Sequence, residues 1–166
     1  MEINKGPIHA KITGDFGEAL VLYWLSKYGF ECASFDHTGI DIIARNRLTK
    51  EVIGVSVKSR SRNEGTEYED ISIPNDNFAK QRRLAPHSAV FLTSAMFVDA
   101  GKTLRFFILP MAHLLAMFPK GKTTAEWKMT KPYIEKYAVD PLIQTFEFHT
   151  ETIKWWSQQT AAKSPN

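Results

Sequence analysis

Two short runs in the middle of the chain are apolar along nearly their whole length, residues 89–94 (AVFLTS) and 103–109 (TLRFFIL). A strand that is apolar at consecutive positions, and not only at alternate ones, is typically buried on both faces of a sheet. Such strands lie in the centre of a sheet that carries packed helices. The two runs therefore predict a layered α/β fold around a central sheet.

The composition is that of a globular protein. With 43% hydrophobic residues in a chain of 166, enough apolar surface exists to offset the entropy lost on folding, which excludes a disordered, collagen-like or low-complexity chain. The length suits one domain, which we expect to span residues 1–166. The formal net charge of +3 permits nucleic-acid binding without requiring it.

Several classes of protein are excluded by missing motifs. The single cysteine, Cys32, rules out an intramolecular disulfide and a cysteine-based zinc finger. The five histidines are scattered, and no phosphate-binding loop or GxSxG elbow is present. The start lacks a signal-peptide core, and the longest apolar run, residues 19–25, is far shorter than the ~20 residues of a membrane helix. We therefore expect a soluble, cytoplasmic protein.

The periodicity of the first half predicts a helix followed by a meander. Apolar residues at helical spacing predict a helix over residues 15–28, with Asp15 and Glu18 as a capping box and Gly29 as its stop. Runs rich in valine and isoleucine predict three strands, which polar turns separate. These strands cover residues 32–36, 40–45 and 52–58.

The remaining elements complete a mixed sheet. Residues 63–70 (NEGTEYED) predict an acidic surface loop, and residues 75–84 predict a second helix with Asn75 or Asp76 as its cap. The two apolar runs then follow as strands. Beyond Pro110 we expect a C-terminal α/β extension over about residues 110–158, with a short helix, a strand at residues 126–129 and a packed aromatic tail that includes Trp155 and Trp156.

Three side chains suggest chemistry at one end of the meander. Side chains alternate along a strand, so Ser56 and Lys58 share one face. A hairpin to this strand would bring Asp41 opposite the Ser56–Lys58 end. Carboxylates suit a hard cation such as Mg²⁺, which activates water and stabilises phosphate charge, and a lysine can orient that water. This combination favours phosphodiester hydrolysis.

Each of these residues also has an ordinary structural explanation. Glu18 would only cap its helix if it closes a capping box with Asp15. Lys58 could end an apolar strand by extending its ammonium group to solvent. Asp41 is harder to explain in this way, because an aspartate that leads a buried strand is unfavourable unless something binds it.

Three segments together resemble the PD-(D/E)XK nuclease superfamily, in its restriction endonuclease-like, Holliday-junction-resolvase-like branch. They are GEALVLYWL at residues 17–25, GIDIIA at residues 39–44 and VSVKSR at residues 55–60. The resemblance covers about residues 13–109 and implies an αβββαβ core, which matches the predicted element order. It also implies DNA binding, Mg²⁺- or Mn²⁺-dependent endonuclease activity and a homodimer.

The resemblance assigns roles to individual residues. Asp41 and Glu18 match the metal-binding acids and Lys58 matches the catalytic lysine. The catalytic set that the resemblance implies is completed by Ser56 and by Gln81, which with Lys80 matches a position on the second helix that often faces the site. Contacts to DNA phosphates are expected from the basic residues around these motifs, which are Arg60, Arg62, Lys80, Arg82 and Arg83.

One position departs from the superfamily pattern. Ser56 stands where an acidic residue is expected, and a hydroxyl is a much weaker Mg²⁺ ligand than a carboxylate. Three outcomes are open. Glu18 and Asp41 suffice with the Val57 carbonyl as a further ligand, or a carboxylate of the acidic loop (Glu67, Glu69 or Asp70) enters the site. In the third outcome catalysis is lost, and the chain is an inactive nuclease-fold protein that acts as a nucleic-acid-binding or structural module.

Overall fold

The first helix begins earlier than its sequence pattern predicts. The computed structural model describes residues 6–35, 39–63, 65–84, 90–99 and 103–149. Helix α1 spans Pro7–Lys27, with Gly6 as its N-cap and a proline in its first turn. Asp15 and Glu18 therefore lie inside the helix, and the predicted capping box is wrong. The helix ends as predicted before Gly29, whose φ of 83° is a conformation that favours glycine.

The predicted three-stranded meander is confirmed with small shifts. Strands β1 (Phe30–Ser34), β2 (Ile42–Asn46) and β3 (Val52–Arg62) pair antiparallel in succession. Strand β3 is four residues longer than predicted. Its pairing with β2 ends at Val55, which lies opposite Ile42, and β3 continues from there to Arg62.

The two apolar runs form neighbouring strands of the same sheet. Strand β5 (Val90–Asp99) pairs parallel with β3, and β6 (Thr103–Pro110) pairs antiparallel with β5, so the sheet is mixed as predicted. Four consecutive residues of β6, from Phe106 to Leu109, are buried, which confirms the expected burial on both faces. The side chains of β5 lie outside the described residues.

The second predicted helix is confirmed. The structure also has a short strand before this helix, which was not predicted. Helix α2 spans Asn75–Leu84, directly after β4 (Ile71–Pro74). Strand β4 is only four residues long and ends in proline, so it carries almost no strand signal. It pairs antiparallel with β7 (Thr124–Trp127), which lies two residues before the predicted strand.

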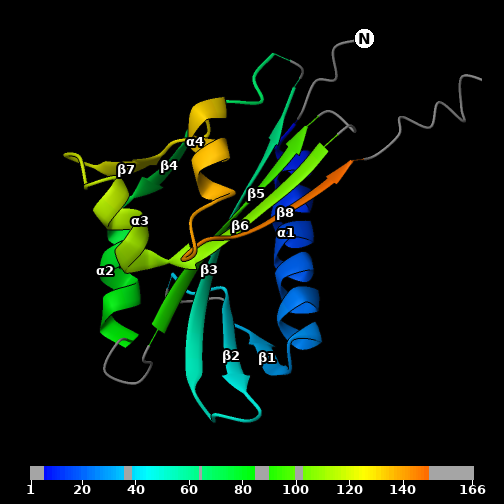
Figure 1. The fold of residues 1–166 in the computed structure, drawn as a ribbon, viewed down its shortest axis with the longest axis vertical. Helices are drawn as coiled ribbons and strands as arrows, with labels where there is room; N and C mark the ends of the chain where they lie inside the picture. Colours follow the sequence, from blue (N-terminus) through cyan, green and yellow to red (C-terminus); the bar gives the residue numbers. More distant parts are fainter. Residues whose placement is uncertain (1–5, 36–38, 64, 85–89, 100–102, 150–166) are drawn as a thin grey trace, which may run out of the picture.

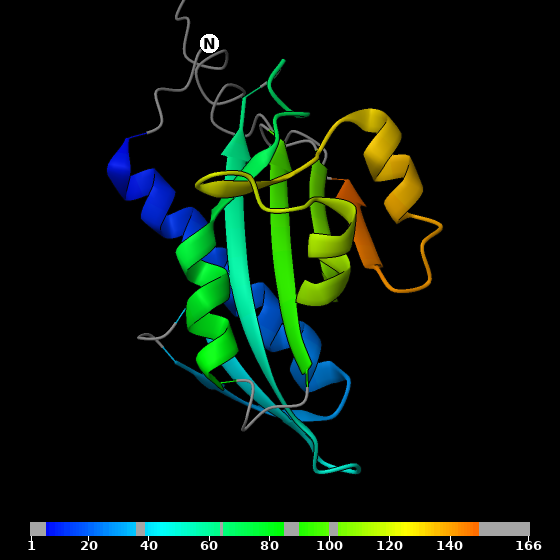
Figure 2. The same ribbon diagram turned by 90° about the vertical axis from the view of Figure 1, so that its left-hand side faces the viewer.

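The C-terminal elements pack on the sheet. Helix α3 (Met111–Met117) follows β6, and helix α4 (Lys131–Tyr137) precedes β8 (Gln144–His149), which pairs with β6. Within the described residues, six strands form one sheet in the order β1-β2-β3-β5-β6-β8. Helix α1 lies on one face, and α2, α3 and α4 lie on the other (Figures 1 and 2). No helix among the described residues is long and apolar enough to cross a membrane.

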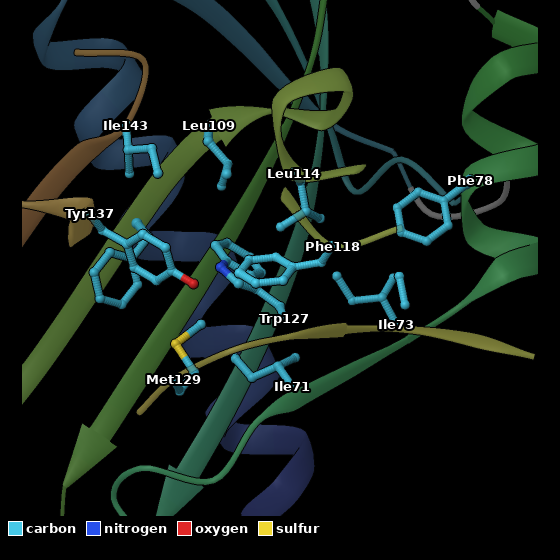
Figure 3. Packing of buried hydrophobic residues seen from close by; sticks show 12 residues of the cluster. Ile71, Ile73, Phe78, Leu109, Leu114, Phe118, Trp127, Met129, Tyr137 and Ile143 are labelled. Carbon is cyan, nitrogen blue, oxygen red and sulfur yellow. The ribbon is translucent and has the colours of Figure 1, made fainter. Parts of the chain in front are cut away.

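The core has two parts because side chains alternate across the sheet. Phe106 and Ile108 point to a cluster beneath α1, whereas Phe107 and Leu109 point to a cluster beneath the other helices. The second cluster contains Trp127 and Tyr137 (Figure 3), so these two aromatic residues of the extension are core residues as expected. Phe148 of β8, which we also expected to be packed, is 52% exposed. Trp155 and Trp156 lie outside the described residues.

Candidate functional site

Strand β3 loses its neighbour at Asp41. Among the described residues, no strand pairs with β3 on the β2 side beyond Val55. The Asp41 backbone N–H donates to the Val55 carbonyl at 2.9 Å, and the Asp41 carboxylate Oδ2 accepts from the Val57 N–H at 2.5 Å. The carboxylate thus takes the place of the backbone carbonyl that would accept from Val57 if β2 continued. Asp41 lies opposite Ser56. This is the placement that the hairpin argument predicts.

Helix α2 fixes the turn that leads into Asp41. Gly39 has a φ of 79°, and a Cβ at this position would lie 3.0 Å from the Cβ of Lys80. The Gln81 side-chain amide donates from Nε2 to the Gly39 carbonyl at 3.2 Å. Gln81 is 3% exposed, and its Oε1 is buried without a hydrogen-bond partner in the part of the chain that the structure describes. The residue predicted to face the site therefore supports Asp41 through the backbone of Gly39.

Ser56 has a buried side-chain hydroxyl that forms no hydrogen bond with the described residues. Because Val55 and Val57 belong to the cluster beneath α1, alternation places Ser56 and Lys58 on the opposite face. Ser56 is 1% exposed, and its Oγ has no partner among the described residues. Lys58, two residues further on the same face, is half-buried and forms no ion pair with a described residue. A buried polar atom without a partner often marks a binding or catalytic position.

Acidic side chains from two elements line one hollow. This hollow, of about 140 Å³, is lined by Asp15 and Glu18 of α1, by Ser34 and Phe35 at the end of β1, and by Asp41. Glu18 is half-buried, and Asp15 pairs with Lys11 at 2.8 Å. Sequence reasoning missed Asp15 as a lining residue because it was taken for a helix cap. Its spacing of three from Glu18 places both on one side of a helix and was the available signal.

The residues fit a hard divalent cation. Glu18 and Asp41 offer only oxygen ligands, and Mg²⁺ is usually held by one or two carboxylates, with water and substrate phosphate filling the remaining positions. The Val57 N–H points toward Asp41, so the Val57 carbonyl, on the same side of the strand, also faces the open edge. Among the described residues, no three His, Cys, Asp or Glu side chains gather closely enough to hold one ion by themselves.

The acidic loop is engaged elsewhere. Glu67 accepts from the Gly65 N–H, Glu69 pairs with Arg62 at 3.1 Å, and Asp70 pairs with Lys128 at 2.5 Å. Arg62 lies six residues along β3 from Ser56, which is about 20 Å in a strand. The structure therefore brings none of the three loop carboxylates to Asp41.

The predicted phosphate contacts fall into two groups. Arg60, Lys80 and Arg82 are exposed, whereas the Arg62 side chain is 16% exposed and holds the acidic loop. Burial lowers the pKa of the Arg62 guanidinium, against the opposite effect of Glu69. The side chain of Arg83 lies outside the described residues. Arg62 is thus placed for a structural role, and the other three remain available to a ligand.

The chain is similar to solved structures of nucleases. It matches Hjc, a Holliday junction resolvase from Archaeoglobus fulgidus, with a TM-score of 0.50 and 17% identity, over 69% of this chain and 83% of that one. It also matches a restriction endonuclease in complex with substrate DNA (TM-score 0.43, 12% identity, 95% and 82% covered). A third match is the bacterial homing endonuclease I-Ssp6803I (TM-score 0.44, 14% identity, 94% and 98% covered).

No family model and no curated protein sequence matches the chain. The similarity to the archaeal resolvase, at this level of identity, concerns the fold alone. The chain has a mixed α/β fold, as its sequence pattern predicts, and this fold is of the restriction endonuclease-like class that the resemblance implies.

Proposed function

We propose that the chain is a metal-dependent DNA endonuclease. The observation that supports this most is the convergence of Glu18 and Asp41, from separate elements, on one hollow at the open edge of β3. Lys58 follows Ser56, the residue opposite Asp41, by two positions on the same strand face. The fold similarity to a Holliday junction resolvase is a second support.

In this proposal the residues have distinct roles. Asp41 and Glu18 hold Mg²⁺ or Mn²⁺, with the Val57 carbonyl as a further ligand. The ion, when bound, lowers the pKa of a water molecule and stabilises the charge that develops on the phosphate. Lys58 orients the attacking water, Ser56 supplies a hydroxyl to the same face, and Gln81 positions Asp41 through Gly39. Arg60, Lys80 and Arg82 contact DNA phosphates.

Further parts of the proposal rest on the sequence, and the dimer rests on the resemblance. We propose that residues 1–166 act as one domain, that two copies associate to address both DNA strands, and that the protein works in the cytoplasm. A catalytically inactive DNA-binding module is the alternative, which the serine at position 56 favours because it removes one carboxylate from the expected ligand set.

The test is a cleavage assay with matched variants. Purified protein is incubated with labelled duplex, branched and single-stranded DNA in Mg²⁺, Mn²⁺ or EDTA. We expect metal-dependent cleavage that falls at least ~100-fold in the Asp41→Asn and Lys58→Met variants. Glu51→Gln and Lys122→Met, which change exposed residues of the same types outside the site, are the controls and should cleave normally.

Two results would overturn the nuclease proposal. One is cleavage that survives unchanged in both site variants. The other is salt-sensitive DNA binding that EDTA does not affect and that no metal converts into cleavage, because this is the behaviour of an inactive binding module.

A further inference from the structure

A second hollow lies along α1, between its N-terminal half and the free end of β3. It encloses about 150 Å³ and is lined by polar side chains from both elements. Helix α1 contributes His9 and Thr13, and β3 contributes Ser59, Arg60 and Ser61. The C-terminal end of β3 and the N-terminal end of α1 lie at the same end of the molecule, as Figure 1 shows.

Three side chains of this hollow carry groups that can donate or accept a hydrogen bond, namely His9, Ser59 and Ser61. Ser59 and Ser61 share the strand face of Val55 and Val57, so both point toward α1. His9 Nε2 lies 3.1 Å from the Ser61 Oγ, and Thr13 donates its hydroxyl to the His9 carbonyl at 2.9 Å. The Ser59 Oγ is buried and has no partner among the described residues. An unused hydroxyl and an imidazole thus meet in one small space.

Charge at this hollow is positive. The Arg60 side chain turns back along the strand, and its Nη1 donates to the Ser59 carbonyl at 3.0 Å, which keeps the guanidinium beside the hollow. Among the described residues, no carboxylate lines this hollow. The N-cap of α1, Gly6, also lines it, and the first turn of this helix has neither a side-chain cap nor an acidic residue. The positive end of the helix dipole therefore adds to the charge of Arg60.

The two hollows on α1 have opposite character. Thr13 lines the positive one and Glu18 the acidic one, and five helical residues separate them by about 7.5 Å along the axis. Successive phosphates of one DNA strand advance by about 3.4 Å along the duplex axis. A strand that runs along this axis with its scissile phosphate at the acidic hollow can thus place a phosphate about two nucleotides away over the positive one.

We propose that this second hollow binds a backbone phosphodiester about two nucleotides from the one that is cleaved, with hydrogen bonds from Ser59, Ser61 and His9 and with the charge of Arg60. The inference rests on the proposed function. A nucleophilic role for Ser61 is not favoured, because among the described residues no carboxylate contacts His9 to orient its ring. The hollow is therefore a binding subsite for DNA.

The first test follows the His9 ring by proton NMR, with its signals identified by their loss in His9→Gln. The probes are the dinucleoside phosphate d(TpT), inorganic phosphate and, as a control without phosphate, thymidine. We expect d(TpT) to shift the His9 signals in a saturable manner and thymidine to leave them unchanged. The Ser61→Ala variant should require a several-fold higher concentration of d(TpT). A response to inorganic phosphate alone would overturn the assignment to a backbone phosphodiester.

The second test uses duplex DNA and separates this inference from the proposed function. The His9→Gln/Ser61→Ala variant should bind DNA with a Kd raised about 5–10-fold, in the range of one lost phosphate contact. His149→Gln, which changes an exposed histidine at the end of β8, should bind normally. If DNA is cleaved by the wild type while neither the Kd nor the His9 signals respond, the subsite is wrong and the nuclease proposal stands. If d(TpT) shifts His9 but no DNA is cleaved, the subsite stands and the nuclease proposal fails.

Discussion

Ser56 bears on how strongly the proposed metal site would hold a cation. Its side chain lies opposite Asp41, is 1% exposed, and has a hydroxyl without a partner among the described residues. A carboxylate at this position would add a third charged ligand, but a buried carboxylate without a counter-ion is strongly destabilising. Serine is therefore compatible with a stable metal-free protein and with weak metal binding.

This argument predicts opposite responses of two variants at position 56. Ser56→Asp should lower the free energy of unfolding in EDTA by about 3 kcal/mol, because it buries an unpaired charge beside Asp41. Millimolar Mn²⁺ should recover much of that loss, since binding to the folded state alone stabilises it. Ser56→Ala should stay within about 1 kcal/mol of the wild type under both conditions, because no hydrogen bond is lost. Thermal unfolding with Mn²⁺ and with EDTA measures these differences, and an Asp variant that Mn²⁺ does not stabilise would contradict a cation site here.

Individual site residues were predictable where a strand period or a hairpin fixes them. The position of Asp41 opposite Ser56 was predictable because two short strands joined by a short turn form a hairpin, and the register of β2 and β3 agrees with it. The environment of Glu18 was not predictable, because two acids three residues apart can lie in the middle of a helix as well as at its start. Arg62 was expected at a phosphate, but its ion pair with Glu69 depends on how a loop folds back, which no local pattern records.

At the scale of elements, the contact between α2 and the turn at residues 39–41 positions the Asp41 carboxylate. The turn passes so close to the helix that Gly39 has no room for a side chain, and the Gln81 amide binds its carbonyl. Asp41 lies two residues after Gly39, immediately before β2, and its carboxylate accepts a hydrogen bond from the Val57 N–H of β3. The position of the carboxylate thus depends on contact between three elements.

Two glycine variants test this contact. Gly39→Ala should lower the free energy of unfolding by about 1–2 kcal/mol, because φ is 79° and the new Cβ would meet Lys80 Cβ at 3.0 Å. Gly14→Ala is the matched control, since Gly14 lies inside α1 with nothing within 4 Å of its absent Cβ. It should raise stability by up to ~1 kcal/mol, because alanine favours helix. Urea unfolding measures both, and equal effects of the two substitutions would contradict the close approach of α2.

Elements with strong local signals were predicted closely and weaker ones were missed. Helix α2 has a polar residue at its start and a proline after its end, and its bounds were predicted to the residue. The first two turns of α1 were missed because Ile8 and Ile12 are exposed and give no amphipathic pattern with the buried face. Strand β4 was missed because it is stabilised by β7, which lies about 50 residues away and whose pairing cannot be inferred from the sequence around β4.

Over the whole molecule, the C-terminal elements complete the second core. Strand β7 pairs with β4, β8 pairs with β6, and Lys128 binds Asp70 across 58 residues of sequence. Tyr137 of α4 lies in this core at 1% exposure and donates its hydroxyl to the Lys128 carbonyl at 2.6 Å. These links predict that the part of the chain after Pro110 unfolds together with the sheet and not as a separate unit.

Tyr137 makes this coupling measurable through pH. Burial raises the pKa of its hydroxyl well above the usual value near 10. The unfolded chain therefore loses this proton at a lower pH than the folded protein, so the stabilisation is full below about pH 10 and is lost as the pH rises toward the folded pKa. The free energy of unfolding, measured with urea, should fall between pH 8 and pH 11.5. At each pH the sheet and the extension should unfold in a single urea transition. Tyr137→Phe should cost about 1 kcal/mol at pH 8, through the lost hydrogen bond, and should show a smaller decline above pH 10.

Tyr23→Phe, at an exposed tyrosine of α1, is the control and should leave the whole pH profile of the unfolding free energy unchanged. An unchanged alkaline decline in Tyr137→Phe would show that Tyr137 does not carry the coupling.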